Sequence, residues 1–244
     1  MDNKDVHIAV IGMGYVGLPV ALAFAKKYQV LGYDIDTAHI EALQHSVDPS
    51  GEMLEEDFKN RNITFSSDDI ELRQCNVFIV AVPTPVDANK VPDLDPLINA
   101  SNTIGQYLKK GDYVIYESTV FPGCTEEQCL PILEKVSELK VGLDFKLAYS
   151  PERINPGDKT KPFEKIKKVV SASDPEALGY VSSLYDSILD AGVFEAASIK
   201  VAEAAKIVEN TQRDVNIALM NELAIIFDRM EINTLDVLKA AQTK

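Results

Sequence analysis

Three glycines near the N-terminus have the spacing of a phosphate-binding turn. The segment Gly12-Met13-Gly14-Tyr15-Val16-Gly17 fits the pattern G-x-G-x-x-G, directly after an apolar run and at the start of an alanine-rich segment. Gly12 permits a tight turn, Gly14 lets the backbone approach a pyrophosphate, and Gly17 lets a helix pack closely on a strand. Because a predicted strand precedes the pattern and a predicted helix follows it, we expect a dinucleotide-binding turn.

An acidic residue ends the next apolar run. Asp34 lies seventeen residues after Gly17, where a carboxylate accepts hydrogen bonds from ribose hydroxyls. A 2′-phosphate would be repelled there, so NAD is favoured over NADP. We therefore expect NAD as the cofactor, bound by the glycine-rich turn and Asp34.

Polar loops follow three later apolar runs. They are Val82-Pro83-Thr84-Pro85, the segment from Glu117 to Gly123, and the segment from Ser150 to Asp158. Open α/β sheets bind ligands beyond the carboxyl ends of their strands, so these loops predict a crevice at one sheet edge. The candidate cofactor-binding residues in these loops are Val82, Thr84, Ser118 and Thr119.

The apolar runs that must position these loops are typical of buried strands alternating with helices. The predicted strands are 7–11, 29–34, 77–82, 113–116, 145–149 and 168–171, and the predicted helices include 18–27, 95–109 and 126–139. Such alternation over about 190 residues predicts an α/β fold with a doubly wound parallel sheet of the Rossmann type. We expect residues 1–198 to form this NAD-binding domain.

The remaining residues have a different pattern. From Lys200 to Met230 the chain has no Gly or Pro, and apolar residues recur at helical spacing. This predicts one long helix of roughly 30 residues, and a short helix capped by Asn233 or Thr234 follows. Two helices cannot close a core of their own. We expect 199–244 to begin a truncated, all-α central domain, and helix 200–230 to pair with its copy in a homodimer.

Composition and charge exclude several classes of function. Apolar residues make up 46% of the chain and charged residues 25%, as in an ordinary globular protein. The net charge of −14 argues against a nucleic-acid partner. The sequence has no apolar run of membrane-spanning length and no secretory signal, and its odd count of three cysteines fits a reducing compartment. We expect a cytoplasmic protein without membrane or metal partners.

These residues, together with part of the long helix, resemble the UDP-glucose/GDP-mannose dehydrogenase family over nearly the whole chain. The most specific segment is Val201 to Ala224, in which Lys206 and Asn210 share one helix face. With Ser150-Pro151-Glu152-Arg153 and Glu117-Ser118-Thr119-Val120, it looks most like the branch that acts on UDP-N-acetylhexosamines for surface polysaccharide synthesis. The resemblance implies an NAD-dependent enzyme with a UDP-sugar substrate. It also implies that His39, five residues after Asp34, binds the cofactor near the adenosine, where relatives often carry arginine and where histidine can still donate a hydrogen bond.

The resemblance also implies a mechanism. Family members oxidise the C6 alcohol of the sugar twice, using two NAD, through a cysteine-bound thiohemiacetal and thioester. It implies that Thr119 and Glu152 position a water and serve acid–base chemistry, and that Lys206 and Asn210 stabilise the developing oxyanion. The implied substrate-binding residues are Glu152, Arg153, Ile154, Asn155, Lys206 and Asn210.

The nucleophilic cysteine of the family lies in a Gly-Gly-His-Cys segment, which this sequence does not contain. Cys124 opens a predicted helix, whose dipole would lower the pKa of its thiol, but the matching family position is usually a small hydroxyl residue. We expect Cys124 to be structural, Cys129 to face the core, and Cys75 to precede a buried strand. The chain is therefore expected to stop before its catalytic cysteine and to make no uronate alone.

Two other interpretations remain open. The chain can be an NAD-binding module without turnover, or a different Rossmann dehydrogenase of the 6-phosphogluconate or 3-hydroxyacyl-CoA type. The second shares the glycine-rich turn and the long helix, but it does not explain the segment from Ser150 to Asp158. Dehydrogenases with a histidine base are disfavoured, because His7 and His45 lie at a predicted strand start and helix end.

Overall fold

The chain folds into two compact units. The structure is a computed structural model that describes residues 6–154 and 163–243. Contacts between residues divide the chain into a first unit, Met1–Ala204, and a second unit, Ala205–Lys244. Among the described residues, no helix is both long and apolar enough to cross a membrane.

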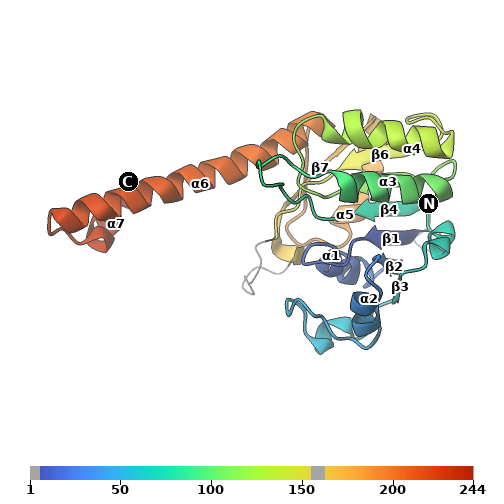
Figure 1. Cartoon of the computed structure of the whole chain (residues 1–244), viewed down its shortest axis with the longest axis horizontal. Helices are drawn as coiled ribbons and strands as arrows, with labels where there is room; N and C mark the ends of the chain where they lie inside the picture. Colours follow the sequence, from blue (N-terminus) through green and yellow to red (C-terminus); the bar gives the residue numbers. More distant parts are fainter. Residues whose placement is uncertain (1–5, 155–162, 244) are drawn as a thin grey trace. The chain divides into compact units, whose positions relative to one another are not determined.

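An eight-stranded sheet forms the centre of the first unit (Figure 1). Its strands lie in the order β3-β2-β1-β4-β5-β6-β7-β8. The order reverses between β1 and β4, and open α/β sheets bind ligands outside such a reversal point. This confirms the predicted Rossmann-type fold. The strands are β1 (His7–Ile11), β2 (Gln29–Tyr33), β3 (Ile63–Ser66), β4 (Val77–Val80), β5 (Tyr113–Tyr116), β6 (Lys146–Tyr149), β7 (Lys168–Ala172) and β8 (Val193–Glu195).

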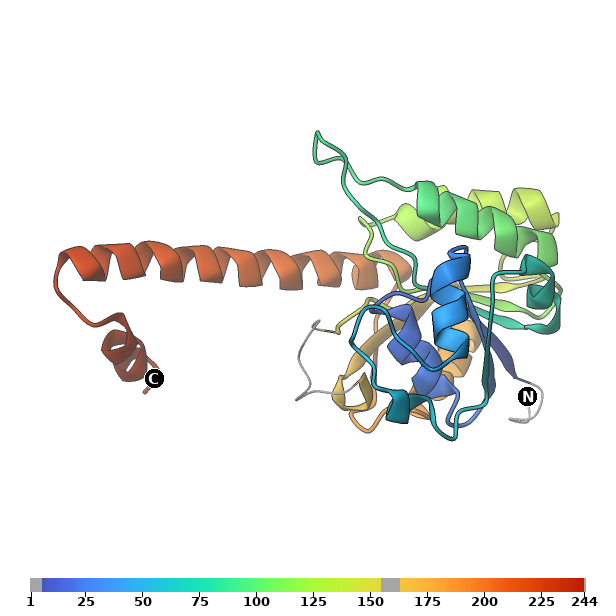
Figure 2. The same cartoon turned by 60° about the horizontal axis from the view of Figure 1, so that its bottom comes forward.

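Helices cover both faces of the sheet. Figures 1 and 2 show α3 (Asp95–Tyr107) and α4 (Leu130–Ser137) on one side, with α1 (Gly17–Phe24) and α5 (Pro175–Asp186) on the other. Strand β1 supplies both cores, because Ile8 and Val10 pack with α1 while Ala9 and Ile11 pack with α3. The other short helices of this unit are α2 (Thr37–Gln44), the 3₁₀ turns Glu55–Phe58, Asp69–Gln74 and Phe163–Lys165, and a π-helical turn, Thr125–Cys129.

One strand departs from the parallel pattern. Strand β7 runs antiparallel to β6, with Tyr149 opposite Ser171, whereas β8 is parallel to β7. An antiparallel neighbour needs no crossover helix, so the chain can turn back after β6 and re-enter the sheet beside it. As a consequence, Lys168 at the start of β7 lies beyond the carboxyl end of β6, next to the loop that begins at Ser150.

The long helix α6 (Ile199–Arg229) begins in the first unit and continues into the second, which confirms the prediction of a long helix here. A short helix, α7 (Thr234–Ala241), follows. The Asn233 side chain caps it by accepting hydrogen bonds from the amides of Leu235 (2.9 Å) and Asp236 (3.3 Å). Apolar side chains of α6 stay exposed in the described chain, among them Val208, Val215 and Leu219.

Candidate functional site

The glycine-rich turn joins β1 to α1, and each of its glycines has its own requirement. Gly12 has a φ of 93°, and a Cβ there would lie 2.9 Å from the Ala81 carbonyl oxygen. A Cβ on Gly17 would lie 1.8 Å from the Gly12 carbonyl oxygen. A Cβ on Gly14 would meet no atom within 4 Å. Two glycines therefore allow close packing, and the third leaves open space beside the backbone, as a bound pyrophosphate requires.

Asp34 follows β2 and holds this turn. Its Oδ2 accepts a hydrogen bond from the Met13 amide (2.8 Å), and its Oδ1 accepts one from the Asp36 amide (3.0 Å). A carboxylate has about four acceptor positions, so both oxygens can still accept from a ribose hydroxyl. The same side chain therefore fixes the turn and remains able to contact a ligand.

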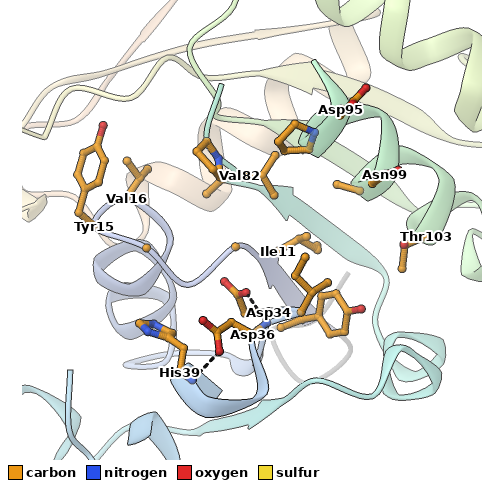
Figure 3. A pocket seen from close by; sticks show the side chains of 18 of the residues that line it. Ile11, Tyr15, Val16, Asp34, Asp36, His39, Val82, Asp95, Asn99 and Thr103 are labelled. Carbon is orange, nitrogen blue, oxygen red and sulfur yellow. Dashed lines mark hydrogen bonds between the residues drawn. The ribbon is translucent and has the colours of Figure 1, made fainter. Parts of the chain in front are cut away.

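Helix α2 brings His39 to the same turn (Figure 3). The helix begins after Asp36, whose Oδ1 accepts hydrogen bonds from the amides of Ala38 (3.0 Å) and His39 (3.1 Å). The His39 Nε2 lies 3.0 Å from the Met13 carbonyl oxygen, to which a protonated Nε2 donates. The imidazole is thus held beside the glycine-rich turn.

A pocket of about 550 Å³ opens beside these residues, within the usual range for small-molecule sites. It lies outside β1 and β4, where the strand order reverses. Of the cofactor-binding candidates, those that line it are Gly12, Gly14, Tyr15, Val16, Asp34, His39 and Val82. Gly17 and Met13 are buried, as the packing of Gly17 and the hydrogen bond of the Met13 amide require.

The opposite wall of the pocket was not predicted. It is formed by α3, which contributes Asp95, Asn99 and Thr103 (Figure 3). Their spacing of four residues places them on one helix face, while Leu97 and Ile104 are buried on another. Sequence periodicity can predict such a polar face, but it cannot tell a face that lines a pocket from one that faces water.

Two hydroxyl groups join the loops that follow β4 and β5. The Ser118 Oγ donates to the Val82 carbonyl oxygen (2.6 Å), and the Thr84 Oγ1 donates to the Thr119 carbonyl oxygen (2.6 Å). Thr84 and Ser118 therefore bond to backbone, whereas the Thr119 residue is exposed. These loops lie together at the carboxyl edge of the sheet, as predicted from their positions along the chain.

A buried charge pair lies behind these loops. The Lys168 Nζ is 2.6 Å from the Glu117 Oε2, and each side chain is only 1% exposed. The Tyr185 hydroxyl donates to the other Glu117 oxygen, and the Lys168 Nζ also donates to the Pro151 carbonyl oxygen (3.3 Å). Lys168 thus holds Glu117, which precedes Ser118, and Pro151, which precedes Glu152. Neither Lys168 nor Tyr185 was predicted to be a site residue.

Glu152 is buried at the start of the loop that follows β6. Burial raises the pKa of the Tyr15 hydroxyl, and the Glu152 carboxylate adds to that shift, so the glycine-rich turn and this loop share one electrostatic environment. The Arg153 Nη1 donates to the Lys167 carbonyl oxygen (2.9 Å), and Ile154 packs against the core that contains α1. Asn155 lies outside the described residues.

Lys206 and Asn210 lie four residues apart on α6, in the second unit. Thr119 and Glu152 lie in the first unit. The grouping of these four side chains around one substrate stays a prediction, as do their catalytic roles.

The first turn of α6 is fixed to the loop after β5 by a buried acid. Glu203 is fully buried, and its Oε2 and Oε1 accept hydrogen bonds from the amides of Gly123 (2.5 Å) and Thr125 (2.9 Å). The Thr125 amide opens the π-helical turn that leads into α4, and Gly123 lies two residues before it, so Glu203 satisfies backbone donors that are distant in the sequence.

All three cysteines are buried in the first unit. A helix dipole was expected to lower the pKa of the Cys124 thiol. The pKa is raised instead, because of a hydrogen bond with Cys129 and because of burial. Burial raises the pKa of Cys75 to about 12. Cys124 and Cys75 therefore stay protonated near neutral pH, and the thiolate is the nucleophilic form. The structure agrees with structural roles for these two residues.

Comparison with known proteins gives two family matches. The model of the UDP-glucose/GDP-mannose dehydrogenase family NAD binding domain matches residues 6–189, and the model of that family's central domain matches residues 200–244. The predicted domain boundary at 198/199 falls between the two matches, and it stays a prediction.

The curated relatives are longer than this chain. UDP-N-acetyl-D-glucosamine 6-dehydrogenase of Pseudomonas aeruginosa is 57% identical over 242 residues, which cover 99% of this chain and 57% of the relative. UDP-N-acetyl-D-mannosamine dehydrogenase of Pyrococcus horikoshii is 34% identical, over 98% of this chain and 58% of the relative. The solved structure of UDP-D-ManNAc dehydrogenase from Pyrococcus horikoshii has a TM-score of 0.88 at 33% identity, with 98% of this chain and 58% of that one covered.

Proposed function

Because the chain belongs to the UDP-glucose/GDP-mannose dehydrogenase family, we propose that it takes part in the NAD-dependent oxidation of the C6 alcohol of a UDP-N-acetylhexosamine. The product is the corresponding uronic acid, for surface polysaccharide synthesis. NAD is the cofactor, since the larger match is to the family's NAD binding domain. The chain spans little more than half the length of its curated relatives, so the whole reaction is a proposal.

The observation that carries the proposal is the glycine-rich turn with Asp34 held across it. The open space beside Gly14 fits a pyrophosphate at the N-terminus of α1, where amide groups and the helix dipole favour an anion. Asp34 would accept from a ribose hydroxyl, and Val82 and His39 would complete the wall. NAD, when bound, supplies the two-electron oxidising power, and these residues hold and orient it.

The catalytic roles are proposed from the match of individual residues to the family. Thr119 would position a water, and its backbone is held by the Thr84 hydroxyl. Glu152 would move a proton at its carboxyl group, which is buried and so shielded from bulk water. Lys206 and Asn210 would stabilise negative charge on the reacting oxygen.

The greater identity to the N-acetyl-D-glucosamine relative, 57% against 34%, favours the gluco epimer of the substrate. The protein encoded by the complete reading frame should therefore form NADH and uronic acid faster from UDP-N-acetylglucosamine than from UDP-N-acetylmannosamine. A preference for the manno epimer would contradict this assignment.

We also propose a homodimer through α6. Its exposed apolar residues include Val208, which is 66% exposed, and such side chains recur from Val201 to Ile226. A second copy of the same helix would remove them from water in a two-fold symmetric contact. Sedimentation showing only monomers at micromolar concentration would contradict the proposal.

Cofactor binding by this chain is the first test. In a calorimetric titration we expect NAD to bind in the micromolar to millimolar range, and NADP to bind at least about 10-fold more weakly, since a 2′-phosphate would lie against the Asp34 carboxylate. Asp34→Asn removes the charge while keeping one acceptor oxygen for the Met13 amide. This variant should therefore bind NADP more tightly than the wild type does.

A matched control is Asp48→Asn, since the Asp48 carboxylate accepts hydrogen bonds from four donors within its own loop and does not line the pocket. It should leave both affinities unchanged. Equal affinity of the wild type for NAD and NADP would contradict the role of Asp34. Absence of binding by a chain that is folded by circular dichroism would contradict the proposed cofactor site itself.

A further inference from the structure

The wall of the pocket formed by α3 has a distinct chemical character. Asp95, Asn99 and Thr103 form a polar stripe along the helix face that lines the pocket, opposite Asp34 and His39 (Figure 3). The buried face of α3 packs into the core through Leu97 and Ile104, so the stripe cannot turn away without unpacking the helix. The stripe therefore presents fixed polar groups to whatever fills this half of the pocket.

The side chains of the stripe are not used by the fold. Among residues 6–154 and 163–243, the Asn99 carboxamide and the Thr103 hydroxyl make no hydrogen bond with a protein atom. Asn102 on the same helix differs, because its Nδ2 donates to the Ile98 carbonyl oxygen (2.8 Å) and it does not line the pocket. Asn99 thus offers a ligand both an acceptor, Oδ1, and a donor, Nδ2.

The charge of the pocket favours a ligand that donates hydrogen bonds. Four aspartates line it, at positions 34, 36, 93 and 95, and no lysine or arginine is among the described residues that do so. Ile35, directly after Asp34, lines the pocket with a side chain that is 82% exposed. Acceptors on the α3 wall and an exposed aliphatic side chain together suit a flat aromatic ring that carries an amino group.

We propose that the α3 stripe selects the base of the dinucleotide, with Asn99 as the residue that recognises adenine. Its Oδ1 accepts from the 6-amino group and its Nδ2 donates to a ring nitrogen, the pairing by which asparagine recognises adenine in nucleic acids. Ile35 packs against the face of the ring. A 6-oxo base instead places an acceptor oxygen against Oδ1 and the nearby Asp95 carboxylate. This inference rests on the proposed binding of NAD with its ribose at Asp34.

The test compares NAD with nicotinamide hypoxanthine dinucleotide, which replaces the 6-amino group by an oxygen and keeps both riboses and the pyrophosphate. Calorimetry on the wild-type chain should give about 10-fold tighter binding of NAD. In Asn99→Ala the ratio of the two dissociation constants should fall close to one, mainly because NAD binds more weakly. In Asn99→Asp, a side chain that can only accept, the preference for NAD should increase.

Asn102→Ala is the matched control, because it removes the same side chain from the same helix outside the pocket. For this variant, the ratio of the dissociation constants of the two dinucleotides should equal the wild-type ratio. Thermal unfolding should show that each variant is folded. An unchanged ratio in Asn99→Ala, or equal binding of the two dinucleotides by the wild type, would overturn the inference while leaving the cofactor site intact. Failure of the folded wild type to bind either dinucleotide would overturn the proposed cofactor site and this inference together.

Discussion

Replacing Gly17 with alanine is expected to destabilise the first unit by about 3 kcal/mol or more. The new Cβ would lie 1.8 Å from the Gly12 carbonyl oxygen, far inside van der Waals contact, and 3.3 Å from the Ala81 Cβ. The clashing atom belongs to the backbone, so no side chain can rotate to make room. The turn must move, and any movement also weakens the hydrogen bond from the Gly12 amide to the Tyr33 carbonyl oxygen (2.8 Å).

Urea unfolding followed by circular dichroism measures this loss as a lower midpoint with an unchanged slope. Gly14→Ala is the matched control, because its Cβ meets no protein atom and its stability should stay within about 1 kcal/mol of the wild type. Its affinity for NAD should nevertheless fall at least about 10-fold, since the methyl group occupies the space that a pyrophosphate needs. An identical unfolding midpoint for Gly17→Ala and the wild type would show that the turn is not packed as described.

Lys168→Met is expected to cost about 3–5 kcal/mol of stability, because it leaves the buried Glu117 carboxylate without its cation. The methionine side chain is nearly as long as that of lysine, and its apolar character suits a buried site. Lost side-chain volume therefore contributes little to the destabilisation. The Tyr185 hydroxyl would still donate to Glu117, but one neutral donor cannot compensate a full charge in this environment. The Pro151 carbonyl oxygen would also lose its donor.

Two further variants separate this effect from the general loss of a lysine. Lys200→Met breaks an ion pair with Glu127 whose side chains are 53% and 58% exposed, and it should change stability by less than about 1 kcal/mol. Glu117→Leu combined with Lys168→Met removes both buried charges and should recover much of the loss. If Lys168→Met is no more harmful than Lys200→Met in urea unfolding, the buried pair does not hold the two loops.

The cofactor turn could be predicted because its signals are local. The strand, the glycines and the following helix are contiguous in sequence, and Asp34 ends the next strand. Each of these residues is recognised by what its immediate neighbours require of the backbone. For the same reason the long helix was predicted nearly to its ends, since Ile199–Arg229 contains neither glycine nor proline.

Shorter elements escaped prediction. Strand β3 has four residues and lies at the sheet edge, β8 has three, and α2 has only eight. Windows of that length contain too few apolar positions for a period to be recognised, so the sheet, not the local sequence, decides their structure. Helix α5 is longer, and Asp174 caps it by accepting a hydrogen bond from the Ala177 amide (2.9 Å), so Asp174-Pro175 is a local signal for the start of this helix.

The contacts that organise the site are also invisible to local reasoning. Lys168 meets Glu117 across 51 residues, and that meeting depends on β7 turning antiparallel to β6. The α3 stripe is a different case, because its spacing is evident in the sequence while the empty space in front of it is not. Residue type and helical period can predict which polar side chains are candidates for a site. The partners of those side chains depend on the topology of the whole sheet.

The buried first turn of α6 limits the positions at which recombination can exchange the helical domain of such proteins. Ile199 and Ala202 pack into the core of the first unit, and the Glu203 carboxylate accepts hydrogen bonds from two backbone amides of the loop after β5. A recombination event that joined a foreign helical domain after residue 198 would therefore also replace part of the nucleotide-binding domain's interior. A hybrid that keeps these hydrogen bonds must either carry an acidic residue at position 203 or have its junction after that position. The loop after β5 thus depends on a side chain that the first residues of the long helix supply.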